Sequence, residues 1–117
     1  LGAEIDVLPP ADSGDPGAGA TVRMRGFGAQ PRPEGAASPI DVGNAGAVLR
    51  LLLGVGALAS EVRYITHHQE SLGRRPNADL LKALESMGVE VESTPPDGRL
   101  PITLRGGRER LRGGRVE

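Results

Sequence analysis

The chain has 117 residues, which is enough for one domain or less. It contains one Phe, one Tyr and no Trp, so its core must be built mainly from aliphatic side chains. The formal net charge is -1, which gives no reason to expect nucleic acid or an anionic membrane as a partner. The lack of Cys excludes disulfides, a thiol nucleophile and Cys-ligated zinc, and it fits a cytoplasmic protein. The longest apolar stretch, near 47–59, is shorter than the roughly 20 residues that a membrane-spanning helix needs.

Alternating apolar and polar residues predict several strands. In chain order these strands are expected over residues 1–8, 21–26, 61–66, 89–92 and 100–104. Two segments rich in Pro and Gly, 9–20 and 28–39, are predicted to be loops. The last strand is expected to end at Gly106-Gly107, and the Arg-rich tail 105–115 to be a solvated turn, because it lacks the interleaved aromatic residues of a nucleic-acid platform.

Helical patterns occupy the middle of the chain. From Ala45 to about Ala59 the sequence is too long for a strand and apolar on nearly every face, which predicts a buried helix. A second helix is predicted from Asn77 to Met87. Pro76 is expected to open this helix and Gly88 to close it, because Pro suits a first turn and Gly suits a C-terminal cap.

The chain also repeats itself. Residues 1–10 and 87–96 share an order of Gly, acidic alternation and Pro-Pro. In both copies a second alternating strand follows and ends in Arg-Gly, at 25–26 and at 105–106. This shared order predicts a repeated unit of a helix followed by a strand pair.

Residues 41–50, Asp-Val-Gly-Asn-Ala-Gly-Ala-Val-Leu-Arg, are the first segment that could carry chemistry. A Gly-rich turn leading into a helix presents backbone N–H groups at the positive end of the helix dipole, a natural place for an anion. Gly46 would let the backbone approach a ligand, and Asn44 could cap the helix or donate to a ligand oxygen. By shape alone, an ordinary capped helix is the simpler interpretation. Arg50 is the only charge between Asp41 and Glu61, so it needs a carboxylate or a bound anion unless its stem reaches solvent.

The second segment is Ser71 to Pro76. Arg74 and Arg75 precede a predicted helix start, where the dipole disfavours cations. A bound carboxylate or phosphate would offset that cost, and a solvated basic loop is the open alternative. His67 and His68 would point to opposite faces of a strand, and no third ligand has metal-site spacing.

These segments, in this order, resemble the 3-phosphoshikimate 1-carboxyvinyltransferase (EPSP synthase) family. The matching stretches are Asp41–Gly46 with Arg50-Leu51, Glu70–Pro76, Leu80–Leu84 continuing to Met87–Val89, and Leu100–Gly107. The resemblance implies an internal piece of the N-terminal-half domain of such an enzyme. It also implies an α+β fold with repeated units of two helices on a four-stranded sheet, part of an inside-out α/β barrel. Residues 1–39 would end one unit, 40–107 would form a second, and 108–117 would begin the next.

For function, the resemblance implies transfer of the enolpyruvyl group of phosphoenolpyruvate to the 5-hydroxyl of shikimate 3-phosphate, with release of phosphate. Gly46, through its backbone, and Arg75, through its guanidinium, would contact phosphoenolpyruvate, while Asn44 and Arg50 would shape that pocket. These two small molecules would be the partners, with no nucleic acid or membrane, and no metal or organic cofactor is implied.

The chain departs from the family pattern in three ways. Ala47 stands where the family usually has Thr, which removes a hydroxyl near the ligand. His67-His68-Gln69 replaces the usual Gly-Asp or Gly-Glu before Glu70-Ser71, which leaves the loop geometry there open. The family's Lys-Ser…Arg motif, its Ser-Ser-Gln stretch and its second domain, with the catalytic acids and bases, are absent. The chain alone is therefore expected to be inactive and to need the rest of a parent chain to complete the site.

Two alternatives differ in their substrates. A related enolpyruvyl transferase acts on UDP-N-acetylglucosamine, but the Gly43–Gly46 helix start and the Leu100–Gly107 strand favour the shikimate enzyme. A non-catalytic repeat module would use the same arginines only to pair with acids.

Overall fold

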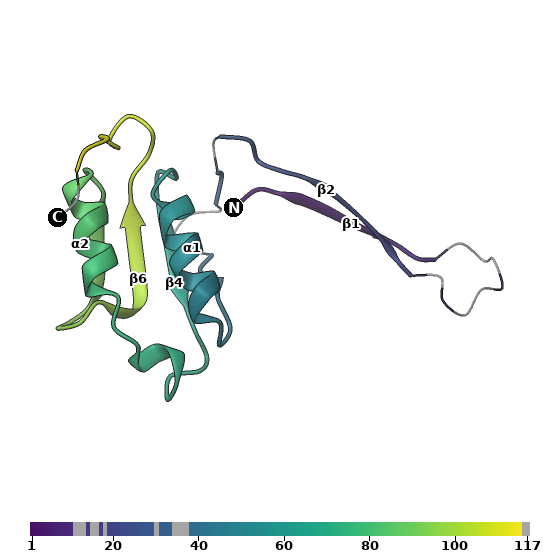
Figure 1. Cartoon of the computed structure of the whole chain (residues 1–117), viewed down its shortest axis with the longest axis horizontal. Coiled ribbons are helices and arrows are strands. Elements are labelled where there is room, and N and C mark those ends of the chain that lie inside the picture. The colour runs from purple at the N-terminus through teal and green to yellow at the C-terminus, as the bar shows by residue number, and fades with distance from the viewer. Residues whose placement is uncertain (11–13, 15–16, 18, 30, 34–37, 116–117) are drawn as a thin grey trace.

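The computed structural model describes residues 1–10, 14, 17, 19–29, 31–33 and 38–115 as an arm joined to a folded body (Figure 1). The arm holds β1 (Glu4–Leu8) and β2 (Thr21–Arg25), which pair antiparallel. The elements of the body are β3 (Ile40–Asp41), α1 (Gly46–Gly56), β4 (Val62–Ile65), the 3-10 helix η1 (Leu72–Arg74), α2 (Ala78–Ser86), β5 (Glu90–Thr94) and β6 (Arg99–Arg105).

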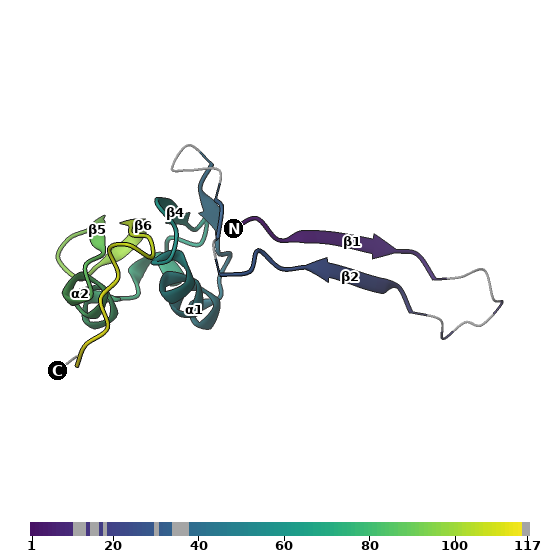
Figure 2. The ribbon, with the colours of Figure 1, turned by 90° about the horizontal axis from the view of Figure 1, so that it is seen from above.

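The body is a mixed sheet with both of its α-helices on one face. The strand order is β3-β4-β6-β5, with β3 parallel to β4 and the other neighbours antiparallel. Figure 2 shows α1 and α2 side by side below the sheet. The mixed α/β class expected from the sequence is confirmed. No helix in the described part of the chain has the length and apolar character that crossing a bilayer requires.

The core lies between the two helices and the sheet. Its largest fully buried side chains are Tyr64, Leu49, Leu53, Leu72, Ile102, Leu104 and Val62. The one Tyr of the chain lies at the centre, and its hydroxyl donates to the Leu52 carbonyl at 2.6 Å. Aliphatic side chains provide the rest of the core, as the composition predicts.

Helix α1 is only half buried, so the expectation of a helix buried on every face is wrong. Leu49 and Leu53 face the core, but Val48 is 44% exposed and Leu51 is 73% exposed. The sheet covers one side of the helix, and nothing in the described ranges covers the opposite side. The apolar composition of this segment therefore exceeds what the body itself can bury.

Several predicted boundaries shift. Helix α2 begins at Ala78 with Asn77 at the N-cap position, so Pro76 precedes the helix instead of occupying its first turn. Gly88 ends the helix as predicted, with φ of +95°, while the Val89 N–H donates to the Leu84 carbonyl at 3.1 Å. Neither β3 nor η1 was predicted, because each is too short to show a period in the sequence.

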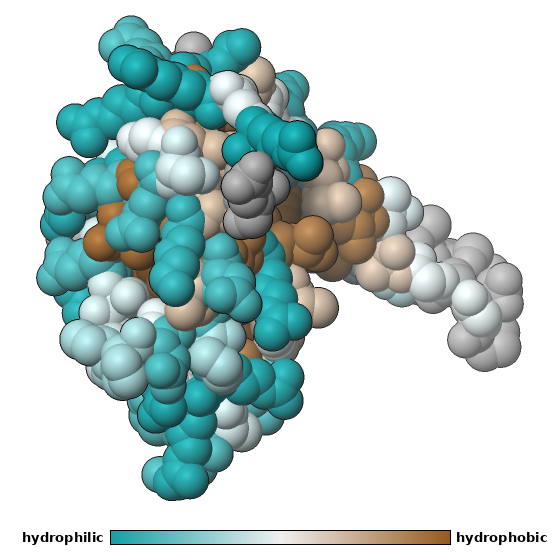
Figure 3. All heavy atoms as spheres, turned by 60° about the vertical axis from the view of Figure 1, so that its left-hand side comes forward, coloured by the Kyte–Doolittle hydropathy of each residue, from teal (hydrophilic) through white to brown (hydrophobic). Residues whose placement is uncertain are grey.

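The arm is long, thin and apolar on one side. Ile5 and Val7 lie opposite Met24 and Val22 in the β1–β2 register, and all of these side chains are at least half exposed. Figure 3 shows apolar surface along the arm next to the body, whereas most of the visible body surface is hydrophilic. The radius of gyration is 17.2 Å, whereas a compact chain of this length has about 13 Å. The predicted loops 9–20 and 28–39 fall partly outside the described residues.

The two strand pairs share one register as far as the irregularity between Ser93 and Thr94 in β5, which supports the internal repeat. Glu4 lies opposite Arg25 in the arm, and Glu90 lies opposite Arg105 in the body. Each Arg directly precedes the Gly that follows its strand. The division into units at 39 and 107 stays a prediction.

Candidate anion-binding site

The start of α1 is built on a turn that Asp41 closes. Its Oδ1 accepts a hydrogen bond from the Gly43 N–H at 2.8 Å. Gly43 has φ of +58°, a left-handed conformation that side chains disfavour. The turn carries the chain from β3 directly into α1, whose N-cap is Ala45, without a side-chain capping bond. The N–H groups of the first helical turn therefore stand at an open helix end, where the dipole is positive.

The side chain of Arg75 lies against this helix end. A Cβ placed on Gly46 would be 2.9 Å from Nη1 of Arg75, so the guanidinium occupies the space that a larger residue at 46 would fill. Arg75 is exposed and has no ion pair with the other described residues. A guanidinium and a set of helix N–H groups thus converge from two segments on one small volume.

Residues on both sides hold the backbone of Arg75. Its N–H donates to the carbonyl of Leu72, a fully buried residue of η1, at 3.1 Å. On the other side, the buried Asn77 side chain donates to the Arg75 and Gly98 carbonyls, both at 3.1 Å. The arginine therefore projects from a fixed backbone, which reduces the entropy lost when its side chain binds an anion.

Asn44 acts differently from a helix cap. Its Oδ1 accepts a hydrogen bond from the Ser71 hydroxyl at 2.7 Å, which joins the α1 turn to the segment before η1. The cap expectation for Asn44 is therefore wrong, and the second expectation, donation to a ligand, stays open for the amide nitrogen. Ser71 is a site residue that the sequence did not single out, because its partner lies 27 residues away.

Two other arginines near this helix end, Arg74 and Arg50, differ in their ion pairing. Arg74 pairs with Glu70 four residues earlier, so it is not equivalent to its neighbour Arg75. Arg50 is exposed, as the solvent interpretation requires, and it has no ion pair with another described residue. It lines a hollow of about 390 Å³ with residues 76–80 at the start of α2. Arg50 thus lies next to the segment that carries Arg75.

The loop 66–68 contacts the turn that precedes α1 through Thr66 and His67. The Thr66 hydroxyl donates to the Gly43 carbonyl at 2.6 Å and accepts from the His68 N–H at 3.0 Å. His67 Nε2 lies 3.3 Å from Asp41 Oδ2. Both histidines follow β4 instead of lying on it, which corrects their expected strand placement. In the described residues, no three His, Cys, Asp or Glu side chains gather as metal ligands would.

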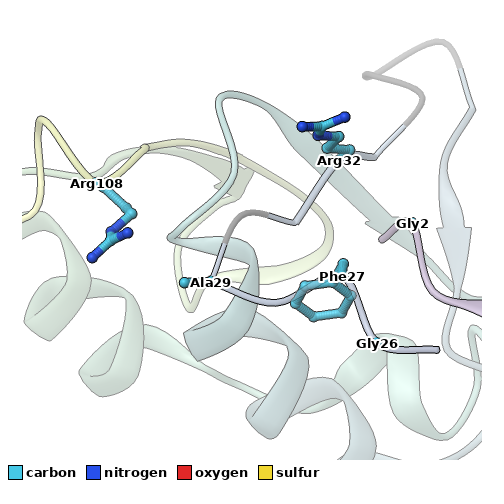
Figure 4. Close-up of a pocket in the computed structure, with 6 residues that line it drawn as sticks. All are labelled: Gly2, Gly26, Phe27, Ala29, Arg32 and Arg108. Carbon is cyan, nitrogen blue, oxygen red and sulfur yellow. The ribbon is translucent and has the colours of Figure 1, made fainter.

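A second hollow lies at the base of the arm, away from this site. Its volume is about 380 Å³, and Phe27, Arg32 and Arg108 line it together with small residues (Figure 4). The two arginines come from different segments and lie on different sides of the hollow, so they do not converge on one point. The helix end at Gly46 is therefore the better candidate for an anion site.

Comparison with known proteins identifies the family. The family model for EPSP synthase (3-phosphoshikimate 1-carboxyvinyltransferase) matches residues 15–117. A curated 3-phosphoshikimate 1-carboxyvinyltransferase of Deinococcus radiodurans is 50% identical over 94 residues, which are 80% of this chain and 20% of that protein. One of Burkholderia pseudomallei is 45% identical over 65 residues, 56% of this chain and 14% of that protein.

The fold agrees with solved structures. An EPSP synthase from Acinetobacter baumannii superposes with a TM-score of 0.67 and 26% identity, covering 91% of this chain and 21% of that chain. The chain thus spans about a fifth of the length of the first curated relative. The ordered motifs, the mixed α/β fold and the family match together show that this chain belongs to the EPSP synthase family.

Proposed function

We propose that the complete polypeptide containing this chain transfers the enolpyruvyl group of phosphoenolpyruvate to the 5-hydroxyl of shikimate 3-phosphate and releases phosphate. The observation that carries this proposal is the placement of the Arg75 guanidinium beside Gly46 at the start of α1. Family membership supplies the reaction class. This chain provides part of the phosphoenolpyruvate site.

Phosphoenolpyruvate carries a carboxylate and a phosphate, and the site offers matching donors. The first N–H groups of α1 bind one anionic group at the positive end of the helix. Arg75 approaches the same volume with a planar guanidinium, which binds carboxylate or phosphate through two parallel hydrogen bonds. Gly46 keeps the space between them open, because even one added methyl group would meet Arg75.

Asn44 and Arg50 complete the pocket. Ser71 binds the Asn44 side-chain oxygen, which fixes the amide and leaves its nitrogen free to donate to a ligand. Arg50 lies one helical turn beyond Gly46 and adds a second cation on the side of α2. Two cations near two anionic substrates lower the electrostatic cost of bringing those substrates together.

The same chemistry explains why this chain alone should be inactive. Enolpyruvyl transfer by addition and elimination needs groups that protonate and deprotonate the reacting carbon and hydroxyl. The described site provides anion binding, while its carboxylates at Asp41 and Glu70 are paired with His67 and Arg74. The catalytic acid, the base and the acceptor site must come from the rest of the polypeptide.

The test measures phosphate release from phosphoenolpyruvate by the complete natural polypeptide, with either shikimate 3-phosphate or UDP-N-acetylglucosamine as acceptor. Arg75→Gln is compared with the matched neighbour Arg74→Gln. We expect release only with shikimate 3-phosphate, a loss of about 100-fold or more in kcat/KM for phosphoenolpyruvate in Arg75→Gln, and little change in Arg74→Gln. Release with UDP-N-acetylglucosamine alone would assign the related enzyme, and release with neither acceptor would leave a non-catalytic repeat module.

A further inference from the structure

We infer that His67 is a positioning residue for the turn that starts α1, and that its protonation strengthens anion binding at Gly46 and Arg75. The inference rests on the proposed function, because it concerns the regulation of that same site. It also gives a role to His67, whose side chain the anion site itself does not use.

The loop 66–68 holds the turn through two separate contacts. Thr66 binds the Gly43 carbonyl at 2.6 Å, and His67 Nε2 lies 3.3 Å from Asp41 Oδ2. The other oxygen of the same carboxylate, Asp41 Oδ1, accepts the Gly43 N–H at 2.8 Å. The carboxylate therefore bridges the imidazole and the turn, and any rotation of the Asp41 side chain loosens both contacts.

The charges near His67 make Asp41 its relevant partner. Asp41 lies at the end of β3, and the charged groups around η1 are Glu70, Arg74 and Arg75. Glu70 pairs with Arg74, so Asp41 is the carboxylate that His67 contacts within the described residues. The neighbouring His68 side chain has no hydrogen bond or ion pair with another described residue, although its backbone bonds to Thr66 and Ser71.

This arrangement determines whether protonation of His67 strengthens or weakens anion binding. Protonated His67 forms a charge-assisted contact with Asp41 and neutralises the negative charge that is bonded to the Gly43 turn. Neutral His67 leaves the carboxylate unneutralised, and a negative charge beside the helix end opposes an anionic ligand. Binding is therefore tighter when the His67 imidazole is protonated and weaker when it is neutral. The His67 side chain is 80% exposed, so the expected change is roughly two- to fivefold.

The experiment measures the dissociation constant of phosphoenolpyruvate by calorimetry between about pH 5.5 and about pH 8.5. The complete natural polypeptide is compared with His67→Gln, His67→Lys and the matched control His68→Gln. Because the ligand phosphate also titrates in this range, the ratio of variant to wild-type constants is the readout. We expect His67→Gln to bind roughly two- to fivefold more weakly at the acid end and equally at the alkaline end. His67→Lys should bind more tightly than wild type at the alkaline end, and His68→Gln should follow wild type throughout.

Two further comparisons distinguish a failure of this inference from a failure of the proposed function. If His67 acts through Asp41, the double variant Asp41→Asn/His67→Gln should match Asp41→Asn alone. The Asp41→Asn substitution keeps a side-chain oxygen that can accept the Gly43 N–H, so the turn is preserved. A His67→Gln ratio that stays at one across the pH range, while Arg75→Gln abolishes binding, would overturn this inference and leave the proposed function intact.

A separate measurement tests the role of His67 if the proposed function fails. If the wild-type protein does not bind phosphoenolpyruvate, the proposed function falls, and the link from His67 to the turn is tested by the Gly43 amide resonance. This resonance should shift between about pH 8.5 and about pH 5.5 in wild type and in His68→Gln, but not in His67→Gln. An identical pH response in all of these proteins would overturn the positioning role.

Discussion

A methyl group placed on Gly46 would lie 2.9 Å from Nη1 of Arg75, so the first residue of α1 and the arginine before α2 share one small volume. The contact joins two segments that each look ordinary alone: a Gly-rich helix start and an Arg-rich loop. Their convergence supports the anion interpretation over that of a plain helix cap.

Gly46→Ala should weaken phosphoenolpyruvate binding without unfolding the protein. The added methyl group meets the flexible end of Arg75, so the guanidinium moves away from the helix end while the backbone stays in place. Loss of one charge-assisted contact corresponds to roughly 10-fold or more in the dissociation constant, measured by calorimetry.

Gly54→Ala is the matched control, since it changes Gly to Ala on the same helix. A methyl group there meets nothing within 4 Å. It should leave binding unchanged and stabilise α1 by about 0.5–1 kcal/mol. Equal weakening of binding by both variants would contradict the specific role of Gly46.

Leu53→Ala and Leu51→Ala should differ sharply in stability, because α1 buries only one face. Leu53 is fully buried, whereas Leu51 is 73% exposed. The buried truncation should lower the free energy of unfolding by about 2–5 kcal/mol, and the exposed one by less than about 0.5 kcal/mol. Urea unfolding of the complete polypeptide measures both. A large loss for Leu51→Ala would show that another part of that polypeptide covers this face.

Tyr64 should make the protein sensitive to alkali. Burial raises the pKa of the Tyr64 phenol to about 12, so above about pH 10 the unfolded chain loses this proton before the folded chain does. The contribution of Tyr64 to the free energy of unfolding is therefore fully present below about pH 10. It falls by up to about 2–3 kcal/mol as the pH approaches 12.

Tyr64→Phe isolates this contribution. The variant should be about 1 kcal/mol less stable at neutral pH, because the Leu52 carbonyl loses the hydroxyl. Its stability should fall less steeply between about pH 10 and about pH 12, as followed by urea unfolding. Parallel pH profiles for the two proteins would show that Tyr64 does not cause the loss of stability in alkali.

The sequence predicts the regular parts of this fold because they carry visible periods. The apolar stripes of α1 and α2 and the alternation in β1, β2, β4 and β6 all lie close to their expected positions. Two features escape such reasoning. The strand β3 has too few residues to alternate, and the exposure of Leu51 depends on which elements the chain places beside α1.

Sequence reasoning reaches only part of the candidate site, for a similar reason. Gly46 and Arg75 lie in segments whose composition points to a helix end and an anion. Thr66 and Ser71 carry no such signal, because hydroxyl residues occur everywhere and their partners lie 23 and 27 residues away. Their contacts to Gly43 and Asn44 become visible only in the structure, where the 66–71 segment packs against the turn before α1.

Arg105→Met should destabilise the body through charge repulsion. Arg105 contacts Glu61 at 2.8 Å, Glu90 at 3.2 Å and Glu92 at 3.3 Å, and so connects the start of β4 with β5 and β6. Hydrogen bonds to Glu61 and Glu92 raise the pKa of the Arg105 guanidinium, so its charge persists at every working pH. Without it, Glu61, Glu90 and Glu92 lose the cation that they share, while Glu90 keeps Arg110 at 3.8 Å, and Tm should fall at neutral pH.

The size of this fall should depend on salt and acid, which distinguishes repulsion from lost packing. Screening by about 1 M salt shortens the reach of the repulsion to about 3 Å, and protonation of the carboxylates in acid removes the repulsion. The Tm difference between Arg105→Met and wild type should shrink under both conditions. Arg25→Met is the matched control, since Arg25 pairs with Glu4 at the equivalent position of the arm but is 83% exposed. Its Tm should stay near the wild-type value, and a fall in Arg105→Met that is unchanged by salt and acid would place the role of Arg105 in the packing of its stem.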